Sequence, residues 1–202
     1  MPNDRYASFD YCFNYFQFFR ESGEISALAA PANLQDSCLQ LGFYLASWGM
    51  YQGSTQLLKN SLKYLVPLIK VVARTDVSLW EIDAHCYTES NIDQLLQLRC
   101  AILQAYPNMT PALLTKSMLG VFGNVPAFDT NFRQACRAAG IDTTFGPKAL
   151  EQIGVFYQEN ASLIDSYRHQ LSTLDFVTGE HTHRSYTRAK LIDMAFFIEG
   201  GA

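Results

Sequence analysis

Apolar residues recur at intervals of three and four along most of this chain, and this spacing is the feature that most limits its possible folds. Within residues 91–106, the apolar positions at this spacing are Ile92, Leu95, Leu96, Leu98, Ile102 and Leu103. Because a helical turn takes 3.6 residues, side chains at this spacing line one face of an α-helix, whereas a strand alternates every second residue. The sequence therefore predicts an all-α fold.

Helix-starting and helix-breaking residues bound the expected elements. We expect about eight helices in a single globular domain over residues 1–202, without a linker, internal repeat or low-complexity tract. Their predicted ranges are 9–20, 33–52, 55–73, 91–106, 111–122, 128–139, 148–170 and 186–198, with a further short helix around Trp80. Ser8 and Ser54 are expected N-caps, and Pro67 is expected to bend or divide its helix. Residues 172–182 are expected to form a loop or a tight hairpin.

The predicted helix at residues 33–52 carries a stripe of small residues, Gly42, Ala46, Gly49 and Gly53. Small residues in one stripe let a second helix approach closely, although each glycine costs about 1 kcal/mol of helix propensity. The remaining faces are also apolar, which is typical of a helix buried on all sides. We therefore expect this helix at the centre of the fold.

The composition excludes several classes of protein. Hydrophobic residues make up 49% of the chain and charged residues 17%, which rules out disorder. A formal net charge of −4 argues against gripping DNA by bulk electrostatics, although a local basic patch stays open. No run approaches the roughly twenty apolar residues of a membrane span. The scarcity of charge also suggests apolar surface covered by a protein partner or by a second copy.

The cysteines and the N-terminus indicate a cytoplasmic protein. The five cysteines are widely scattered and form no Cys-x-x-Cys pair, so we expect reduced thiols: Cys12, Cys38, Cys86, Cys100 and Cys136. Residues 1–5 lack the basic start of a secretory signal. No phosphate-binding glycine loop and no metal motif is present, and we therefore expect no cofactor.

Residues 115–141 hold a lysine, a Phe-Gly helix end, an Asp-Thr pair and two arginines four residues apart. These are Lys116, Phe122-Gly123, Asp129-Thr130, Arg133 and Arg137. Their order resembles the stretch of helix-hairpin-helix DNA glycosylases that runs from the hairpin lysine to the catalytic aspartate. This chain departs from that family in having Pro111-Ala112-Leu113-Leu114 where the Gly-x-Gly hairpin belongs.

The resemblance implies a helix-hairpin-helix glycosylase-like fold and a catalytic role for Asp129. Such a carboxylate stabilises the positive charge that builds on the sugar of a flipped-out nucleotide. Lys116, Arg133 and Arg137 would contact the nucleic acid. A structural interpretation of the same residues stays open: Asp129 as a helix N-cap, Lys116 as a solvated helix residue, and the two arginines as a solvated surface.

A second basic segment lies near the C-terminus. Arg184, Arg188 and Lys190 fall where a loop leads into a helix, an arrangement that can bind the phosphates of nucleic acid. His181 and His183 could supply two metal ligands, but zinc needs three or four, so we expect no metal site and favour an exposed basic loop. Lys190 and Asp193 are three residues apart and are predicted to form a structural ion pair.

Longer stretches resemble a widespread group of bacterial proteins. These stretches are Phe9–Cys12, Leu41–Met50, Thr115–Asp129 and Lys190–Met194. This resemblance implies a bacterial cytoplasmic origin and a fold kept as one unit, and it implies no activity.

Three functions stay open at this point, and the sequence does not decide whether the protein is an enzyme. The first is a glycosylase-like nucleic-acid-binding protein, which could have lost its activity. The second is a non-catalytic protein-interaction module, for example in a bacterial defence or regulatory complex, with a protein partner or a homo-oligomer. A helical domain that binds a small molecule is the third.

Overall fold

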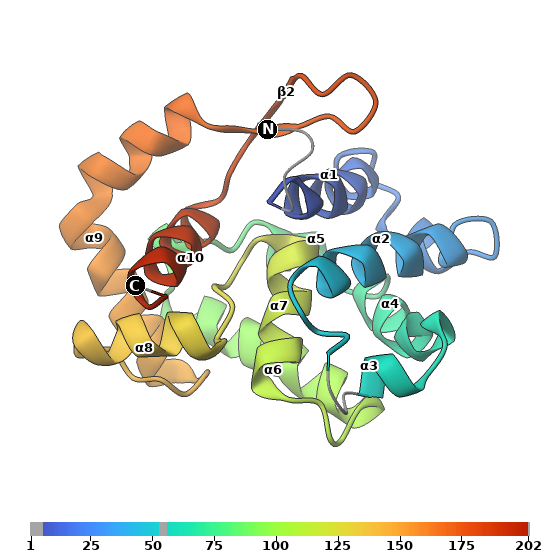
Figure 1. Ribbon diagram of the computed structural model, residues 1–202, viewed down its shortest axis with the longest axis horizontal. Helices are drawn as coiled ribbons and strands as arrows, with labels where there is room; N and C mark the ends of the chain where they lie inside the picture. Colours follow the sequence, from blue (N-terminus) through green and yellow to red (C-terminus); the bar gives the residue numbers. More distant parts are fainter. Residues whose placement is uncertain (1–5, 53–55, 202) are drawn as a thin grey trace.

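A computed structural model describes residues 6–52 and 56–201 and shows helices joined by short connections, with one small hairpin (Figure 1). Its α-helices are α1 Ala7–Glu21, α2 Leu34–Ser47, α3 Gln56–Lys59, α4 Val66–Val72, α5 Val77–Trp80, α6 Glu89–Ala105, α7 Pro111–Phe122, α8 Thr130–Ala138, α9 Pro147–Gln170 and α10 Arg188–Glu199. Its 3-10 helices and strands are η1 Ile25–Ala29, η2 Leu62–Leu65, η3 Ala84–Cys86, β1 Ser172–Leu174 and β2 His181–Ser185. The predicted all-α class is confirmed.

Local signals set several helix ends as predicted. The Thr110 side chain accepts the N–H of Leu113 at 3.3 Å at the start of α7, and Pro111 is its first residue. Gly123 ends α7 in the left-handed conformation, with φ +68°. The expected cap at Ser8 is wrong, because α1 begins at Ala7 and Ser8 lies buried inside its first turn. The expected cap at Ser54 falls outside the described residues.

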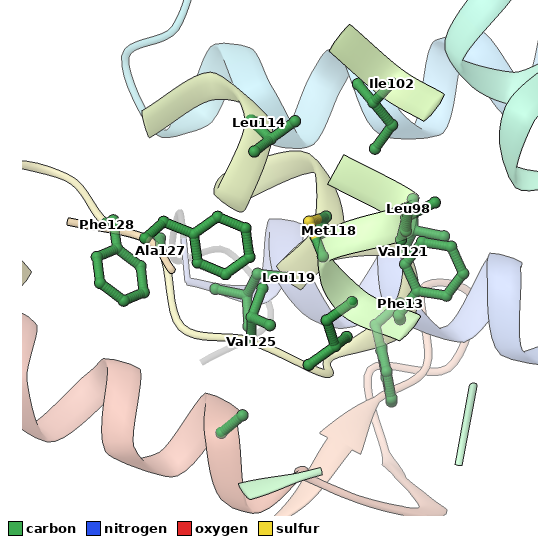
Figure 2. Packing of buried hydrophobic residues seen from close by; sticks show 14 of the residues in the cluster. Phe13, Leu98, Ile102, Leu114, Met118, Leu119, Val121, Val125, Ala127 and Phe128 are labelled. Carbon is green, nitrogen blue, oxygen red and sulfur yellow. The ribbon is translucent and has the colours of Figure 1, made fainter. Parts of the chain in front are cut away.

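Helix α7 lies at the centre of the hydrophobic core. Each of its residues from Leu113 to Phe122 is buried. Figure 2 shows Met118, Leu119 and Val121 of α7 packed among side chains from other elements, including Phe13 of α1 and Leu98 of α6. The core is thus organised around the segment that carries the glycosylase resemblance.

The predicted glycine-striped central helix is wrong in its extent and its place. Helix α2 ends at Ser47, and Gly49 lies beyond it in a turn with φ +78°. Gly53 falls outside the described residues. Gly42 of α2 is closely approached, since an added Cβ there would lie 2.5 Å from Leu62 Cδ1. An added Cβ on Gly120 of α7 would likewise lie 2.5 Å from the Tyr44 ring. Tyr44 of α2 thus packs directly on the α7 backbone.

Pro67 divides its segment rather than bending one long helix. The predicted helix 55–73 is present as α3, η2 and α4, with Pro67 in the first turn of α4. Proline is tolerated there because the first helical N–H groups have no partner within the helix. The segment is therefore divided, with one break at Asn60 and Ser61 and a change from η2 to α4 next to Pro67.

The segment predicted as a loop or hairpin is an antiparallel hairpin that packs on α1. Strands β1 and β2 pair with Ser172 opposite Ser185 and Leu174 opposite His181. The Leu174 N–H donates to Asp10 Oδ2 at 3.0 Å, which holds the hairpin against α1. Helix α9 leads into β1 after a kink at Asn160 and curves along one side of the molecule (Figure 1).

Among residues 6–52 and 56–201, no helix is both long and apolar enough to cross a membrane.

Candidate functional site

Lys116 lies in the protein interior, so the interpretation of this residue as a solvated helix residue is wrong. It is only 5% exposed. Its Nζ lies 3.0 Å from Asp129 Oδ2 and donates to the Trp48 carbonyl at 3.2 Å. The same ammonium lies 5.6 Å from the centre of the Trp48 ring, within range of a cation–π interaction. The chain therefore joins the lysine and the aspartate of the glycosylase-like stretch in one ion pair.

Asp129 caps helix α8, as its structural interpretation predicts. Its Oδ1 accepts the N–H of Phe132 at 3.0 Å, while Oδ2 faces Lys116. The side chain is 13% exposed. Both oxygens therefore take part in holding the fold, one in the helix cap and one in the ion pair.

A second buried ion pair lies beside the first. Lys190 Nζ lies 3.0 Å from Asp193 Oδ2, which confirms the predicted pair, and Asp193 Oδ1 accepts the N–H of Ala127 at 2.9 Å. The Lys190 ammonium also lies 4.6 Å from the centre of the Phe9 ring and 5.4 Å from that of Trp48. Lys190 is 4% exposed, so in this conformation it offers little charge to a nucleic acid.

The two C-terminal arginines are also paired with carboxylates. Arg184 donates to both oxygens of Glu21, at 2.9 and 2.6 Å. Arg188 donates to Asp165 Oδ1 at 2.8 Å and lies 3.7 Å from Asp83 Oδ2. The adjacent carboxylates offset the positive charge of both guanidinium groups, which weakens their attraction for a phosphate.

The histidines predicted as two possible metal ligands lie on β2. His181 Nδ1 lies 3.1 Å from the Ser172 carbonyl oxygen, and His183 Nε2 lies 3.8 Å from Glu21 Oε2. In the part of the chain that the structure describes, no three His, Cys, Asp or Glu side chains are placed to hold a metal ion together.

Asp83 joins the η3 segment to the start of α10, a role that the sequence analysis did not predict. This buried carboxylate accepts the N–H groups of Ala84, Arg188 and Ala189 at 2.7, 2.9 and 2.8 Å, and so holds the first turn of α10. Burial by itself raises the pKa of Asp83, but the neighbouring His85 imidazole and the three backbone N–H groups outweigh it, so the pKa is lowered. The side chain therefore favours its charged form despite its burial.

A partly enclosed pocket between α6, α7, α8 and the loop before α9 brings two arginines together. Its volume is about 250 Å³. The residues that line it are Arg99, Leu103, Pro107, Met109, Pro111, Leu114, Arg133, Thr143, Thr144 and Phe145. None of these lining residues is acidic, although the chain as a whole has a net charge of −4.

The two arginines of this pocket keep free hydrogen-bond donors. Arg99 donates from one terminal nitrogen to the Phe145 carbonyl at 3.2 Å, which fixes its position and leaves its other N–H groups available. The Nε of Arg133 is buried and has no hydrogen-bond acceptor within the described part of the chain. An unsatisfied buried donor costs about 1–3 kcal/mol.

Apolar side chains and a rigid loop complete the pocket. The loop is held by Asp142, whose Oδ1 accepts the N–H of Thr144 at 2.8 Å, and this turn places Thr143 and Thr144 at the pocket wall. Arg137 is exposed one turn beyond Arg133 on α8 and does not line the pocket. The sequence singled out Arg133 but gave no signal for Arg99, which stands in an amphipathic helix without a motif.

No protein-family model matches the chain, and comparisons with curated proteins and with solved structures find no match.

Proposed function

We propose that this chain binds a phosphate-bearing ligand, a nucleotide or the phosphorylated end of a nucleic acid, in the pocket of Arg99 and Arg133. The observation that carries the proposal is that two arginines line one pocket that has no carboxylate among its lining residues. Guanidinium groups bind phosphate oxygens through two parallel hydrogen bonds, and the bonds are stronger because both partners are charged.

The apolar wall of the pocket favours a ligand with a flat apolar part beside its phosphate. Leu103, Pro107, Met109 and Pro111 lie next to the arginines and can pack against the face of a base. Thr143 and Thr144 add hydroxyl groups that can bond a sugar or phosphate oxygen. This combination of charge and apolar surface suits a nucleotide better than a free inorganic ion.

The overall charge agrees with recognition of one phosphate rather than of a long backbone. Lys116, Lys190, Arg184 and Arg188, four of the cations that the sequence singled out for nucleic acid, are paired with carboxylates and so do not form a free basic surface. Binding that neutralises a single phosphate loses affinity only weakly as salt rises, with a slope near −1 in log affinity against log salt.

Isothermal titration calorimetry tests the proposal. The ligands are a nucleoside 5′-monophosphate, the matching nucleoside, inorganic phosphate, and single-stranded DNA with and without a 5′-phosphate. We expect binding of the monophosphate or of the phosphorylated DNA, with the stronger of the two identifying the source of the phosphate. The nucleoside and the unphosphorylated DNA should bind at least about tenfold more weakly, a difference of about 1.4 kcal/mol.

Two arginine variants on the same helix provide the matched comparison. Arg133→Gln should weaken binding by about tenfold or more, whereas Arg137→Gln, outside the pocket, should change it by less than about twofold. Binding of none of the phosphate ligands, or an equal loss in both variants, would contradict the proposal.

The second candidate function is glycosylase-like catalysis at Asp129. It is favoured by the pairing of Lys116 with Asp129 at 3.0 Å, because the resemblance implies a nucleic-acid contact for the lysine and a catalytic role for the aspartate. Catalysis would require this ion pair to open when DNA binds. The test compares the wild-type chain with Asp129→Asn on DNA that contains damaged bases, because asparagine preserves the helix cap. Release of bases by the wild type but not by Asp129→Asn would support this function. If neither protein releases bases, the function is excluded.

A further inference from the structure

The hairpin between β1 and β2 ends in an exposed apolar tip. Phe176 is 75% exposed and Val177 is 88% exposed. The tip is nevertheless well ordered by local bonds, since Asp175 Oδ1 accepts the N–H groups of Val177 and Thr178 at 2.9 and 2.8 Å. The Tyr11 ring of α1 supports Phe176 edge-on, with the two ring centres 5.0 Å apart. An aromatic side chain held in place in this way resembles the anchors that dominate protein interfaces.

A separate apolar groove lies between α2, the turn that precedes it and the η2–α4 segment. Its volume is about 430 Å³, and its apolar lining is Pro31, Leu34, Cys38, Leu39, Leu62 and Val66. An apolar cavity of about 150 Å³ is enough to take up a benzene ring. The groove therefore has room for an aromatic side chain together with an aliphatic neighbour.

The charges beside the tip and the groove are opposite in sign. Residues 172–181, which hold the tip, include Asp175 and Glu180 and no lysine or arginine. The wall of the groove that the η2–α4 segment provides consists of Ser61, Leu62, Lys63 and Val66, and its one charged residue is a lysine. Lys63 lines the groove itself and is exposed. Opposite charges at the rim of an apolar contact favour association of the tip with the groove over association of two surfaces of like charge.

We infer that the hairpin tip of one copy of this chain inserts Phe176 and Val177 into the apolar groove of a second copy. The two surfaces belong to different parts of the molecule, because the hairpin packs on α1 and projects beyond it while the groove is formed by α2 and the η2–α4 segment (Figure 1). Each copy carries both surfaces, so two copies can make the contact twice, or successive copies can make it head to tail. The contact involves no residue that lines the Arg99–Arg133 pocket.

Sedimentation velocity from about 1 to about 200 µM tests this association. The wild-type chain should form a concentration-dependent oligomer. Phe176→Ser on the tip and Leu39→Ser on the groove should each weaken its formation by about tenfold or more. Leu163→Ser removes an apolar side chain on α9 that is 59% exposed, between Leu39 at 47% and Phe176 at 75%, and should leave association unchanged.

Mixing the two defective chains separates the proposed contact from a general loss of apolar surface. The Phe176→Ser chain keeps an intact groove and the Leu39→Ser chain keeps an intact tip, so their mixture should form a heterodimer that neither chain forms alone. The paired charge reversal Lys63→Glu with Glu180→Lys should restore association that either reversal alone weakens. A wild-type chain that stays monomeric would overturn the inference. Binding of a monomeric chain to phospholipid vesicles that depends on Phe176 would also overturn it, because the tip would then be assigned to a membrane surface.

Discussion

Replacing Lys116 by methionine tests whether the buried ion pair between α7 and α8 holds these helices together. Methionine has a similar length, so it fills most of the same space but has no charge or donor. The change leaves Asp129 Oδ2 and the Trp48 carbonyl without the lysine donor that now reaches both. Breaking a buried pair by removing one partner costs about 3–5 kcal/mol, because the other charge stays desolvated.

The structure places the expected cost near the lower end of that range. Asp129 keeps its capping bond to Phe132 and retains 13% exposure, so part of its charge stays solvated. We therefore expect Lys116→Met to lower the free energy of unfolding by about 3 kcal/mol. For a chain of this length each kcal/mol shifts Tm by about 2–4 °C, which gives a fall of about 6–12 °C.

Urea denaturation followed by circular dichroism measures this cost, and a double variant measures its cause. Adding Asp129→Asn removes the unpaired charge while keeping the cap, so the double variant should be more stable than the sum of the two single changes by about 1.5 kcal/mol. Lys148→Met, at a lysine with a side chain 73% exposed, should cost less than about 0.5 kcal/mol. A Lys116→Met cost below about 1 kcal/mol with no coupling to Asp129 would refute the reasoning.

Three further predictions follow from the fold. Asp83→Asn should cost about 2–4 kcal/mol at pH 7. The folded state lowers the pKa of Asp83, so its charged side chain stabilises the fold above its ordinary pKa of 3.8. This stabilisation is lost as pH falls through the folded-state pKa. The free energies of unfolding of the wild type and of Asp83→Asn should therefore converge in acid. Gly120→Ala should cost about 1–3 kcal/mol in thermal unfolding, since its Cβ would lie 2.5 Å from the Tyr44 ring. Thiol labelling should modify exposed Cys100 first, whereas Cys136 is buried with a pKa raised by desolvation to about 12 and should react only on unfolding.

Signals that act within one helical turn allowed the sequence to predict many element boundaries. Thr110-Pro111 and Gly123 bound α7, and Asp129 caps α8, because each of these residues bonds to or constrains only its neighbours along the chain. Pro67 divides its segment for the same reason. Such features can be predicted without knowing the fold.

Features that depend on distant partners could not be predicted in this way. Lysine is usually solvated, and Lys116 is buried only because Asp129 and the Trp48 carbonyl meet it in space. Arg99 gave no signal because its pocket partner Arg133 is 34 positions away in the sequence and lies on another helix. The glycine stripe misplaced the centre of the fold, because local spacing does not say which helix a small residue will face.

Among the charged residues that the sequence singled out, some lie in buried ion pairs and one lies at the pocket. The pairs of Lys116 with Asp129 and of Lys190 with Asp193 neutralise charge inside the core, beside Trp48. Arg133, on the same helix that Asp129 caps, instead faces a pocket with a buried donor that lacks an acceptor. Residues that the resemblance grouped into one site are therefore divided between stabilising the fold and, in our proposal, binding a ligand.

A crystal structure of the chain with a nucleoside 5′-monophosphate tests the central claim most directly. The account predicts electron density for the phosphate in the pocket between α6 and α8, with its oxygens about 2.7–2.9 Å from guanidinium nitrogens of Arg99 and Arg133. An empty pocket under saturating ligand, or a phosphate bound instead beside Arg184 and Arg188, would contradict it.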